Sequence, residues 1–360
     1  MNKEDIMNNK KILENIKKTT IDLINYPTYA GNNEAFIALF DYVKEKMSDF
    51  KIEEKIITYN NHDNYNLIIS NTDEKEFDII FCCHVDVIPF KEYKAIEKGN
   101  RLYGRGSIDM KGQTAVVLEL LKNIDTSKKI ALMLTSDEEM GGFCCQEILK
   151  EYDSKLAVIS DGGSNFELIV EEKGLLQLEL SSFGTSAHGS EPFNGDNAIV
   201  KLINLYNSLI EKHPLPTKDD FELSVTLSKL NGGDANNKVP DYATMNLDIR
   251  FTKTDNIDEL LNYIKNYSPS ISVKVLDLEP VFYVDESLEV IQKFIKDCTK
   301  VLGRKPVITR CCAGSDAPYF SEKNIPVIMM NPDGKNWHAP NEYVEIDSLY
   351  TLYEIYKTLL

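Results

Sequence analysis

The sequence predicts an α/β protein of two domains, in which a larger domain with a mixed sheet is interrupted by a smaller, inserted domain. Three observations predict this organisation. Three short apolar stretches each end in carboxylates or histidine, as strands do at the carboxyl edge of an α/β sheet. Segments with helical periodicity lie between strand patterns. Near residue 174 the pattern changes to a β-α-β-β-α-β order, which is typical of a ferredoxin-like domain.

The N-terminal part is predicted to contain two helices, followed by strands. Apolar spacing and a break at Tyr26-Pro27 indicate helices at 5–25 and 33–48. Strands follow at 51–59 and 64–70. A nearly continuous apolar run from Phe77 to Cys83 then indicates a buried strand, and it ends at His84.

The next elements repeat the pattern of a buried strand that ends in acidic residues. A glycine-rich segment, 104–112, precedes a predicted helix at 112–123. Apolar strands at 129–135 and 156–159 deliver Asp137-Glu138-Glu139 and Asp161 at their carboxyl ends. Because negative charge gathered at one edge of a sheet stabilises little without a cation, this pattern predicts a cation site.

The remaining elements divide the chain into domains. The predicted insert contains strands at 175–183, 221–230, 240–252 and 271–279. Its two helices are predicted at 195–212, after the first strand, and at 255–267, before the last. After Glu279-Pro280 the alternation of helices and buried strands resumes, with helices at 286–302 and 346–359 and short strands at 306–310 and 325–330. We therefore predict one domain from 1–173 and 280–360, and an inserted domain from 174–279.

Composition and charge restrict the possible partners. The chain has 360 residues, 42% of them hydrophobic and 27% charged, as in ordinary globular proteins. Its formal net charge of −17 argues against nucleic acid or an anionic membrane surface as a partner. The N-terminus has no apolar signal region, and no apolar run is long enough to span a bilayer. We expect a cytoplasmic protein that acts on a small molecule.

The cysteines also fit a reducing compartment. Six of the seven form adjacent pairs, at 82–83, 144–145 and 311–312. Neighbouring cysteines on a strand point to opposite faces and do not readily bridge each other. No CxxC spacing indicates a structural zinc site. We interpret these residues as reduced, mostly buried small hydrophobic side chains.

Two histidines are candidate metal ligands. His84, at the end of a buried strand, and His338, in a C-terminal loop, can bind zinc through a neutral imidazole nitrogen. Asp86 could accept a hydrogen bond from the other ring nitrogen of His84 and fix its tautomer. Taken alone, either histidine could equally cap a strand or lie on a surface loop.

The carboxylates complete a pattern that suits a pair of divalent ions. Asp109 could bridge two ions held about 3.5–4 Å apart. One of Glu138 and Glu139 could bind an ion while the other stays free as a base, and Asp161 would complete the second ion's ligands. Each stretch alone could be an ordinary acidic turn. Separate ordinary explanations for all of these stretches are collectively much less economical than one site.

These motifs resemble those of the zinc-dependent peptidase and deacylase family that includes aminoacylases, acetylornithine deacetylases, succinyl-diaminopimelate desuccinylases and glutamate carboxypeptidases. The family's His-x-Asp and Gly-Arg-Gly-x-x-Asp-Met-Lys-Gly motifs correspond to His84–Asp86 and Gly104–Gly112. Its paired glutamates correspond to Glu138-Glu139, and its late histidine before Pro-Asn-Glu corresponds to His338. The resemblance spans nearly the whole chain, in order, and includes the inserted domain.

The resemblance implies the roles of the site residues and two divalent ions per chain, with Zn²⁺ first and Co²⁺ or Mn²⁺ as alternatives. One ion would be held by His84, Asp109 and Asp161, and the other by His338, Asp109 and Glu139. Glu138 would be the general acid/base, and Asp86 would orient His84. The fold implied is a metallohydrolase catalytic domain.

The resemblance further implies that the inserted domain is a lid that also makes a homodimer. His188 would stabilise the oxyanion in a neighbouring subunit's site. Asn237 and Arg250 match lid positions that contact substrate, Arg250 through the substrate carboxylate, and Gly314 matches a glycine-rich loop beside the site. Arg250 could instead form only a salt bridge at the end of a strand.

The expected activity is hydrolysis of an amide bond next to a free carboxylate, in N-acyl amino acids or small peptides. Acetylornithine and succinyl-diaminopimelate enzymes usually carry glutamate where this chain has Asp161, so aminoacylases and small peptidases are the nearer match. A biosynthetic deacylase is the alternative within enzymes. The alternative from another class is an inactive scaffold that binds metal or peptide, although no ligand or base is missing here.

Overall fold

The computed structural model describes residues 3–59, 62–123, 125–218 and 220–360. The chain divides into two compact units, which are Met1–Val170 with Val284–Leu360 and, between them, Glu171–Tyr283. Sequence analysis placed the domain boundaries at 173/174 and 279/280. In the structure the two crossing segments pair with each other, Glu172 with Phe282, so the boundary falls on this short antiparallel pair.

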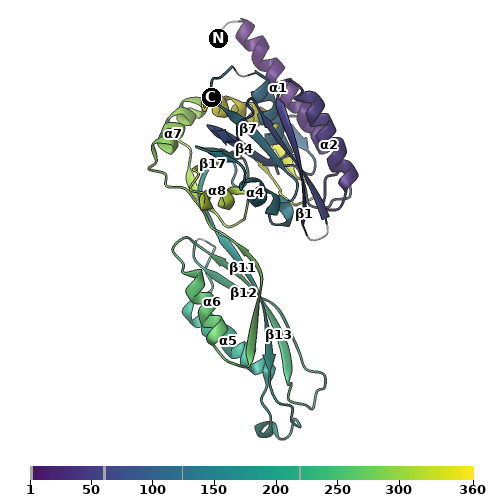
Figure 1. Cartoon of the computed structure of the whole chain (residues 1–360), viewed down its shortest axis with the longest axis vertical. Coiled ribbons are helices and arrows are strands. Elements are labelled where there is room, and N and C mark those ends of the chain that lie inside the picture. The colour runs from purple at the N-terminus through teal and green to yellow at the C-terminus, as the bar shows by residue number, and fades with distance from the viewer. Residues whose placement is uncertain (1–2, 60–61, 124, 219) are drawn as a thin grey trace. The chain divides into compact units, whose positions relative to one another are not determined.

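The larger unit is built on a mixed sheet (Figure 1). Within the described residues the sheet has nine strands, in the order β1-β2-β7-β4-β9-β17-β10-β15, with β16 paired to β10. They are β1 (Lys51–Tyr59), β2 (His62–Ser70), β4 (Ile79–His84), β7 (Ile130–Thr135), β9 (Ala157–Ile159), β10 (Leu168–Glu172), β15 (Phe282–Tyr283), β16 (Ile308–Cys311) and β17 (Val327–Met330). The predicted mixed α/β sheet is confirmed.

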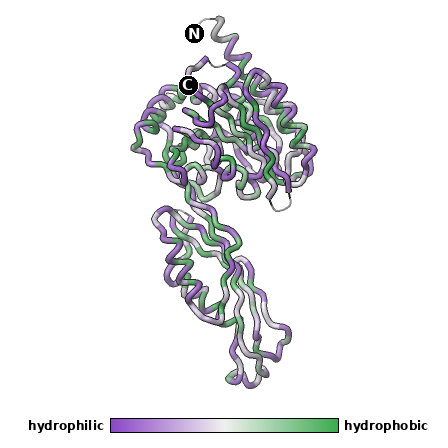
Figure 2. Tube along the Cα trace, viewed as in Figure 1, coloured by the Kyte–Doolittle hydropathy of each residue, from purple (hydrophilic) through white to green (hydrophobic). Residues whose placement is uncertain are grey.

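The centre of this sheet is parallel and buried. Strand β4 pairs in parallel with β7 and with β9, and β9 pairs in parallel with β17. Every residue of β4 and β7 is buried, and Figure 2 shows hydrophobic residues running along the central strands. Strands buried on both faces read as continuous apolar runs, which is why they were visible in the sequence.

Helices pack against this sheet and against one another. They are α1 (Lys3–Ile24), α2 (Asn33–Lys46), α3 (Lys111–Asn123), α4 (Phe143–Ile148), α7 (Glu289–Leu302), α8 (Ala317–Glu322) and α9 (Ile346–Lys357), with a 3₁₀ turn, η1 (Glu138–Met140). Helix α3 packs against α1 and α9, and α2 packs against β2. Cys144 and Cys145 lie on α4 and therefore do not belong to a strand.

Small sheets, built from short strands that were not predicted, connect segments that are distant in the sequence. One small sheet has the order β18-β19-β6-β5, and another pairs β3 with β8. Their bounds are β3 (Glu76–Phe77), β5 (Ile96–Lys98), β6 (Arg101–Tyr103), β8 (Asp153–Ser154), β18 (Gly334–Lys335) and β19 (Tyr343–Glu345). Because β6 pairs with β19, the segment that begins at Gly104 lies beside the loop that carries His338.

The smaller unit, called the inserted unit below, has the predicted β-α-β-β-α-β order. Its antiparallel sheet has the strand order β12-β13-β11-β14. The elements are β11 (Gly174–Phe183), a 3₁₀ turn η2 (Pro192–Asn194), α5 (Ala198–Lys212), β12 (Ser224–Gly232), β13 (Tyr242–Phe251), α6 (Ile257–Asn266) and β14 (Ile271–Glu279). This order confirms the ferredoxin-like topology.

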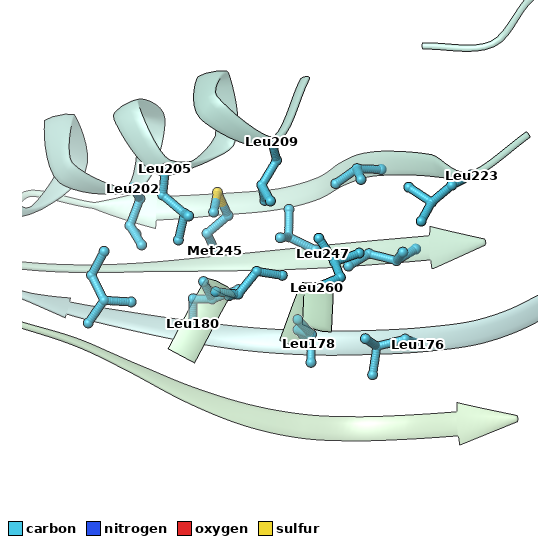
Figure 3. Close-up of a cluster of buried hydrophobic side chains, with 14 of the residues drawn as sticks. Leu176, Leu178, Leu180, Leu202, Leu205, Leu209, Leu223, Met245, Leu247 and Leu260 are labelled. Atoms are coloured by element: carbon cyan, nitrogen blue, oxygen red, sulfur yellow. The ribbon is translucent and has the colours of Figure 1, made fainter. Parts of the chain in front are cut away.

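Alternation along the strands builds the core of the inserted unit. In β13 the residues from Ala243 to Phe251 alternate between buried and half-buried positions. The buried side chains of β11 and β13 pack against α5, where Leu202, Leu205 and Leu209 lie on one face (Figure 3). Asn197 caps α5, since its side chain accepts hydrogen bonds from the backbone of residues 199 and 200. Among the described residues, no helix is both long and apolar enough to cross a bilayer.

Candidate metal centre

The parallel centre of the sheet brings three segments to one edge. Strand β4 ends at His84, which pairs with Thr135 at the end of the neighbouring β7. Asp161 follows β9, on the other side of β4. Since the carboxyl ends of parallel strands meet at the same edge, the side chains that follow them converge there.

His84 lies in the first of two groups of possible ligands. Its Nε2 atom lies 3.0 Å from Oδ1 of Asp109 and 3.9 Å from Oδ2 of Asp161. Oε2 of Glu138 lies at a similar distance from the same nitrogen, 4.0 Å. His84 itself is 1% exposed, so the imidazole faces these carboxylates and little else.

His338 lies in the second group. Its Nε2 atom lies 3.1 Å from Oδ2 of Asp109 and 3.1 Å from Oε2 of Glu139. Asp109 therefore presents one carboxylate oxygen to each histidine, the geometry of a bridging ligand. The structure thus brings together all five residues expected as ligands, and Glu138 is a further possible ligand in the group of His84 and Asp161.

Asp86 contacts His84 through two of its atoms. Nδ1 of His84 lies 3.1 Å from the backbone carbonyl oxygen of Asp86 and 3.5 Å from Oδ1 of its carboxylate. The other carboxylate oxygen, Oδ2, accepts a hydrogen bond of 2.9 Å from the backbone N–H of Glu139. Asp86 therefore ties the histidine strand to the turn that carries the paired glutamates.

The ionisation of the group reflects its crowded negative charge. Burial, and then the charge of Asp109, raise the pKa of Asp161 to about 7. Burial and the charge of Asp161 raise the pKa of Glu138 well above its ordinary value. Hydrogen bonds to Asp109 and Glu139 raise the pKa of His338 to about 10. Without a cation, protons are retained to offset the carboxylate charge.

Opposing influences act on the remaining two members of the group. Burial raises the pKa of Asp109, but hydrogen bonds with His338 and His84 outweigh it and leave that pKa below its usual range. Burial lowers the pKa of His84, while hydrogen bonds to Asp109 and Asp86 raise it to a net value well above the ordinary one. Both shifts favour an anionic Asp109 between two cationic partners.

A buried ion pair connects the two loops that carry Asp109 and His338. Nη1 of Arg105 lies 2.6 Å from Oε2 of Glu342, and both side chains are 2% exposed. The other oxygen of Glu342 accepts a hydrogen bond from the backbone N–H of Ile108. Both residues lie in the glycine-rich and Pro-Asn-Glu motifs, for which the sequence indicated no contact with each other. Their opposite charges were the signal available, since nothing in the two motifs indicates that they meet.

A polar pocket lies next to the His338 loop. Its volume is about 660 Å³, and Asn336, Ala339 and Asn341 form part of its wall. Basic residues also line the pocket, and they are Lys91, Lys94, Lys98, Arg101 and Arg105. Glu92 is the only acidic residue among the described lining residues. In a chain of net charge −17 this is a local concentration of positive charge.

The other predicted site residues lie apart from the ligand groups or in the inserted unit. Gly314 is exposed, in the loop before α8. His188 is exposed and bonds through Nδ1 to Oγ of Ser190 at 2.7 Å, which leaves Nε2 available. The backbone N–H of Gly189 donates to the carbonyl of Asn237 and His188 forms a β-bridge with Lys238, so segments 188–189 and 237–238 pair with each other. Arg250 forms an ion pair with Asp248 at 3.0 Å.

Known proteins resemble this chain along most of its length. The sequence model of peptidase family M20/M25/M40 matches residues 80–360 of this chain. An uncharacterized metallohydrolase of Methanocaldococcus jannaschii is 27% identical, over 97% of this chain and 99% of its own. An acetylornithine deacetylase of Buchnera aphidicola is 28% identical, over 97% and 96% of the two chains. A tripeptidase structure from Staphylococcus aureus has the same fold, with a TM-score of 0.79 at 20% identity over 96% and 97%.

Proposed function

Because the chain belongs to peptidase family M20/M25/M40 and is a metal-dependent amide hydrolase, we propose that it cleaves N-acyl amino acids or small peptides at the amide bond next to a free carboxylate. One observation carries the proposal. Asp109 presents its two oxygens to two histidines, His84 at 3.0 Å and His338 at 3.1 Å. That arrangement supports a centre for two divalent ions rather than one.

The donor set fits two cations. His84 and Asp161, with Asp109 as the bridge, would hold one, and His338, Asp109 and Glu139 would hold the other. Glu138 also lies within reach of the first ion, and we assign it the role of base instead. Imidazole nitrogen and carboxylate oxygen suit Zn²⁺, which we propose as the resident ion, and Co²⁺ or Mn²⁺ would also be accepted. The carboxylates that now retain protons are the groups a cation would neutralise.

The residues of the chain would divide the chemistry among them. When bound, a pair of divalent ions lowers the pKa of water and polarises a carbonyl group. Glu138, which stands beside the ligands without a hydrogen bond to either histidine among the described residues, would take the proton from the attacking water. It would then pass the proton to the leaving amine. Asp86 would orient His84 and hold the turn that carries Glu139 in place, through its hydrogen bonds to both.

The inserted unit would supply recognition and closure. We propose that His188 stabilises the oxyanion in the site of a partner subunit, and that Asn237, its neighbour, contacts the substrate. Arg250 would bind the substrate carboxylate in place of Asp248. Gly314 would leave room for substrate beside the site. The unit would thus act as a lid and as the contact of a homodimer.

A substrate panel tests the activity and its carboxylate requirement. The wild type should hydrolyse N-acyl amino acids or dipeptides, and chelator should abolish this hydrolysis. Arg250→Ala should raise KM by about 10- to 100-fold for a substrate with a free carboxylate, because a hydrogen bond to a charged group is lost. It should change KM little for the amidated analogue. Lys265→Ala, which removes an exposed cation of the same unit, serves as the control.

Two outcomes of the panel would redirect the proposal. Activity confined to N-acetylornithine would favour the biosynthetic deacylase, which the relative from Buchnera aphidicola supports. Chelator-insensitive rates no higher than those without protein, across the panel, would favour the inactive scaffold. An equal rise in KM for the free and the amidated substrate would contradict the role of Arg250 and leave its ion pair with Asp248 as its function.

Metal binding should release protons at neutral pH. The pKa of Asp161 is raised to about 7 and that of His338 to about 10, so both hold protons that a cation must displace. Affinity should therefore rise with pH, steeply below about pH 7, where both groups hold protons, and less steeply from about pH 7 to about pH 10, where only His338 does. Calorimetry of zinc binding in buffers with different ionisation heats should show the release, which Asp161→Asn should reduce. Heats that do not depend on the buffer would contradict this.

The cysteines support a cytoplasmic location, which we also propose. None of the seven forms a disulfide in the described structure, and Cys312 is exposed. Exposed free thiols persist in a reducing compartment and are readily oxidised outside it.

A further inference from the structure

Two cysteines and a carboxylate from three distant segments meet below the candidate metal centre. Cys82 lies on β4, Cys145 on α4, and Asp316 immediately precedes α8. Their possible ligand atoms all lie within 4.8 Å of one another. All three side chains are buried, at 1%, 0% and 3% exposure. We propose that Cys82, Cys145 and Asp316 form a third metal site, which takes a thiophilic divalent ion such as Zn²⁺ and is distinct from the dinuclear centre.

The observed separations suit tetrahedral coordination. Zinc lies about 2.3 Å from thiolate sulfur and about 2.0–2.2 Å from carboxylate oxygen, so sulfur and oxygen ligands of one ion lie about 3.5 Å apart. The separation between Sγ of Cys82 and Oδ2 of Asp316 is 3.6 Å. The backbone carbonyl oxygen of Asp316 lies 3.9 Å from Sγ of Cys145 and offers a further donor. Little movement is needed to close this set around an ion.

Asp316 is unusually placed for a residue with only a structural role. Its Oδ2 accepts a hydrogen bond of 3.1 Å from the hydroxyl of Thr135. Its Oδ1 is buried and has no hydrogen-bond partner among the described residues. Its Oδ2 also accepts a weak hydrogen bond from the thiol of Cys82, so Oδ1 is the oxygen left without a donor. A divalent ion would give this buried carboxylate a cationic partner.

The other cysteines show what an ordinary buried thiol looks like in this fold. Cys298 is also fully buried, but its sulfur faces the thioether of Met330 at 4.0 Å, an apolar contact. Neither Cys298 nor Cys83 belongs to a group of possible ligands within the described part of the chain. The combination of two thiols and a carboxylate is therefore specific to Cys82, Cys145 and Asp316.

The third ion would hold together the elements that position the dinuclear centre. Cys82 lies two residues before His84 on β4, and Cys145 lies on the helix that follows the Glu138-Glu139 turn. No ligand is shared with the dinuclear centre. Because the site is enclosed, the ion would bind as the chain folds, and its binding free energy would contribute to stability.

Cobalt provides a test that separates the two centres. Protein produced in cobalt-supplemented medium should show an intense near-ultraviolet band of thiolate-to-cobalt charge transfer. The proposed dinuclear ligands are nitrogen and oxygen only, so this band reports the thiol site alone. Cys82→Ser and Cys145→Ser should each lose most of the band and about one equivalent of metal. Cys298→Ser, the matched control, should keep both.

The outcomes are distinct from those for the proposed function. Visible cobalt bands without a near-ultraviolet band would show a loaded dinuclear centre and overturn the thiol site. A band that survives both Cys82→Ser and Cys145→Ser would also overturn it. If a serine variant does not fold, Asp316→Asn keeps both thiols and should still weaken metal retention. Mass spectrometry that finds Cys82 and Cys145 bridged by a disulfide in the purified protein would likewise overturn the proposal.

Discussion

Glu138→Gln should lower kcat by about 10²- to 10⁴-fold and leave the metal content unchanged, because a general base is lost and no ligand is removed. Glu139→Gln should instead weaken metal binding, since both oxygens of Glu139 face His338 at 3.1 and 3.2 Å. Both variants replace one carboxylate oxygen by an amide nitrogen, at adjacent positions, so each is a control for the other. Metal analysis and kinetics on the same preparations measure both effects.

The geometry makes this comparison necessary. Oε2 of Glu138 and Oδ2 of Asp161 lie almost equally far from Nε2 of His84, at 4.0 and 3.9 Å. Glu138 could therefore be a ligand in place of Asp161. If Glu138→Gln empties the centre while Glu139→Gln leaves it filled, the roles of the pair are reversed.

His188→Ala should lower kcat by about 10²- to 10³-fold with metal content unchanged, the usual loss for one oxyanion donor. His188 is exposed, and the bond from Nδ1 to Ser190 leaves Nε2 free to donate. It belongs to the inserted unit, whereas all five proposed metal ligands belong to the larger unit. His213→Ala, which changes a histidine at the end of α5, should leave kcat unchanged.

Mixed dimers test whether His188 acts on a partner. A chain with His188→Ala and a chain with Glu138→Gln, allowed to exchange subunits, should together recover activity. One of the two sites then has an intact base and an intact histidine from its partner. Proven mixed dimers without recovery would mean that His188 serves its own subunit, and a protein that stays monomeric at assay concentration would contradict the proposed homodimer.

The sequence predicted the elements whose patterns are local. The buried strands β4 and β7 were visible as apolar runs, and the ferredoxin-like order of the inserted unit was visible as alternating periods. The ligand residues could be predicted because each follows such a strand or lies in a glycine-rich motif. Strand β10 (Leu168–Glu172) was missed, because its three apolar residues are followed directly by charged ones.

Contacts between distant segments could not be predicted in the same way. The pairing of β6 with β19 and the ion pair of Arg105 with Glu342 depend on segments more than 200 residues apart. The approach of Cys82 on β4 to Cys145 on α4 is another contact of this kind, and the adjacent-pair pattern of the cysteines carried no sign of it. The carboxylate of Asp86 was expected on His84, and Oδ1 faces that histidine, but the hydrogen bond from the N–H of Glu139 to Oδ2 was not foreseen.

The bridging role of Asp109 is the central claim, and it is tested most directly by comparing the metal content of zinc-supplemented wild type and variants. Asp109→Ala should lose about two equivalents relative to wild type, and Asp161→Ala about one, with hydrolysis lost in the first. Circular dichroism checks that each variant is folded. A wild type that binds less than about half an equivalent at saturation, or a folded Asp109→Ala protein that keeps the wild-type metal content, would contradict the two-metal account.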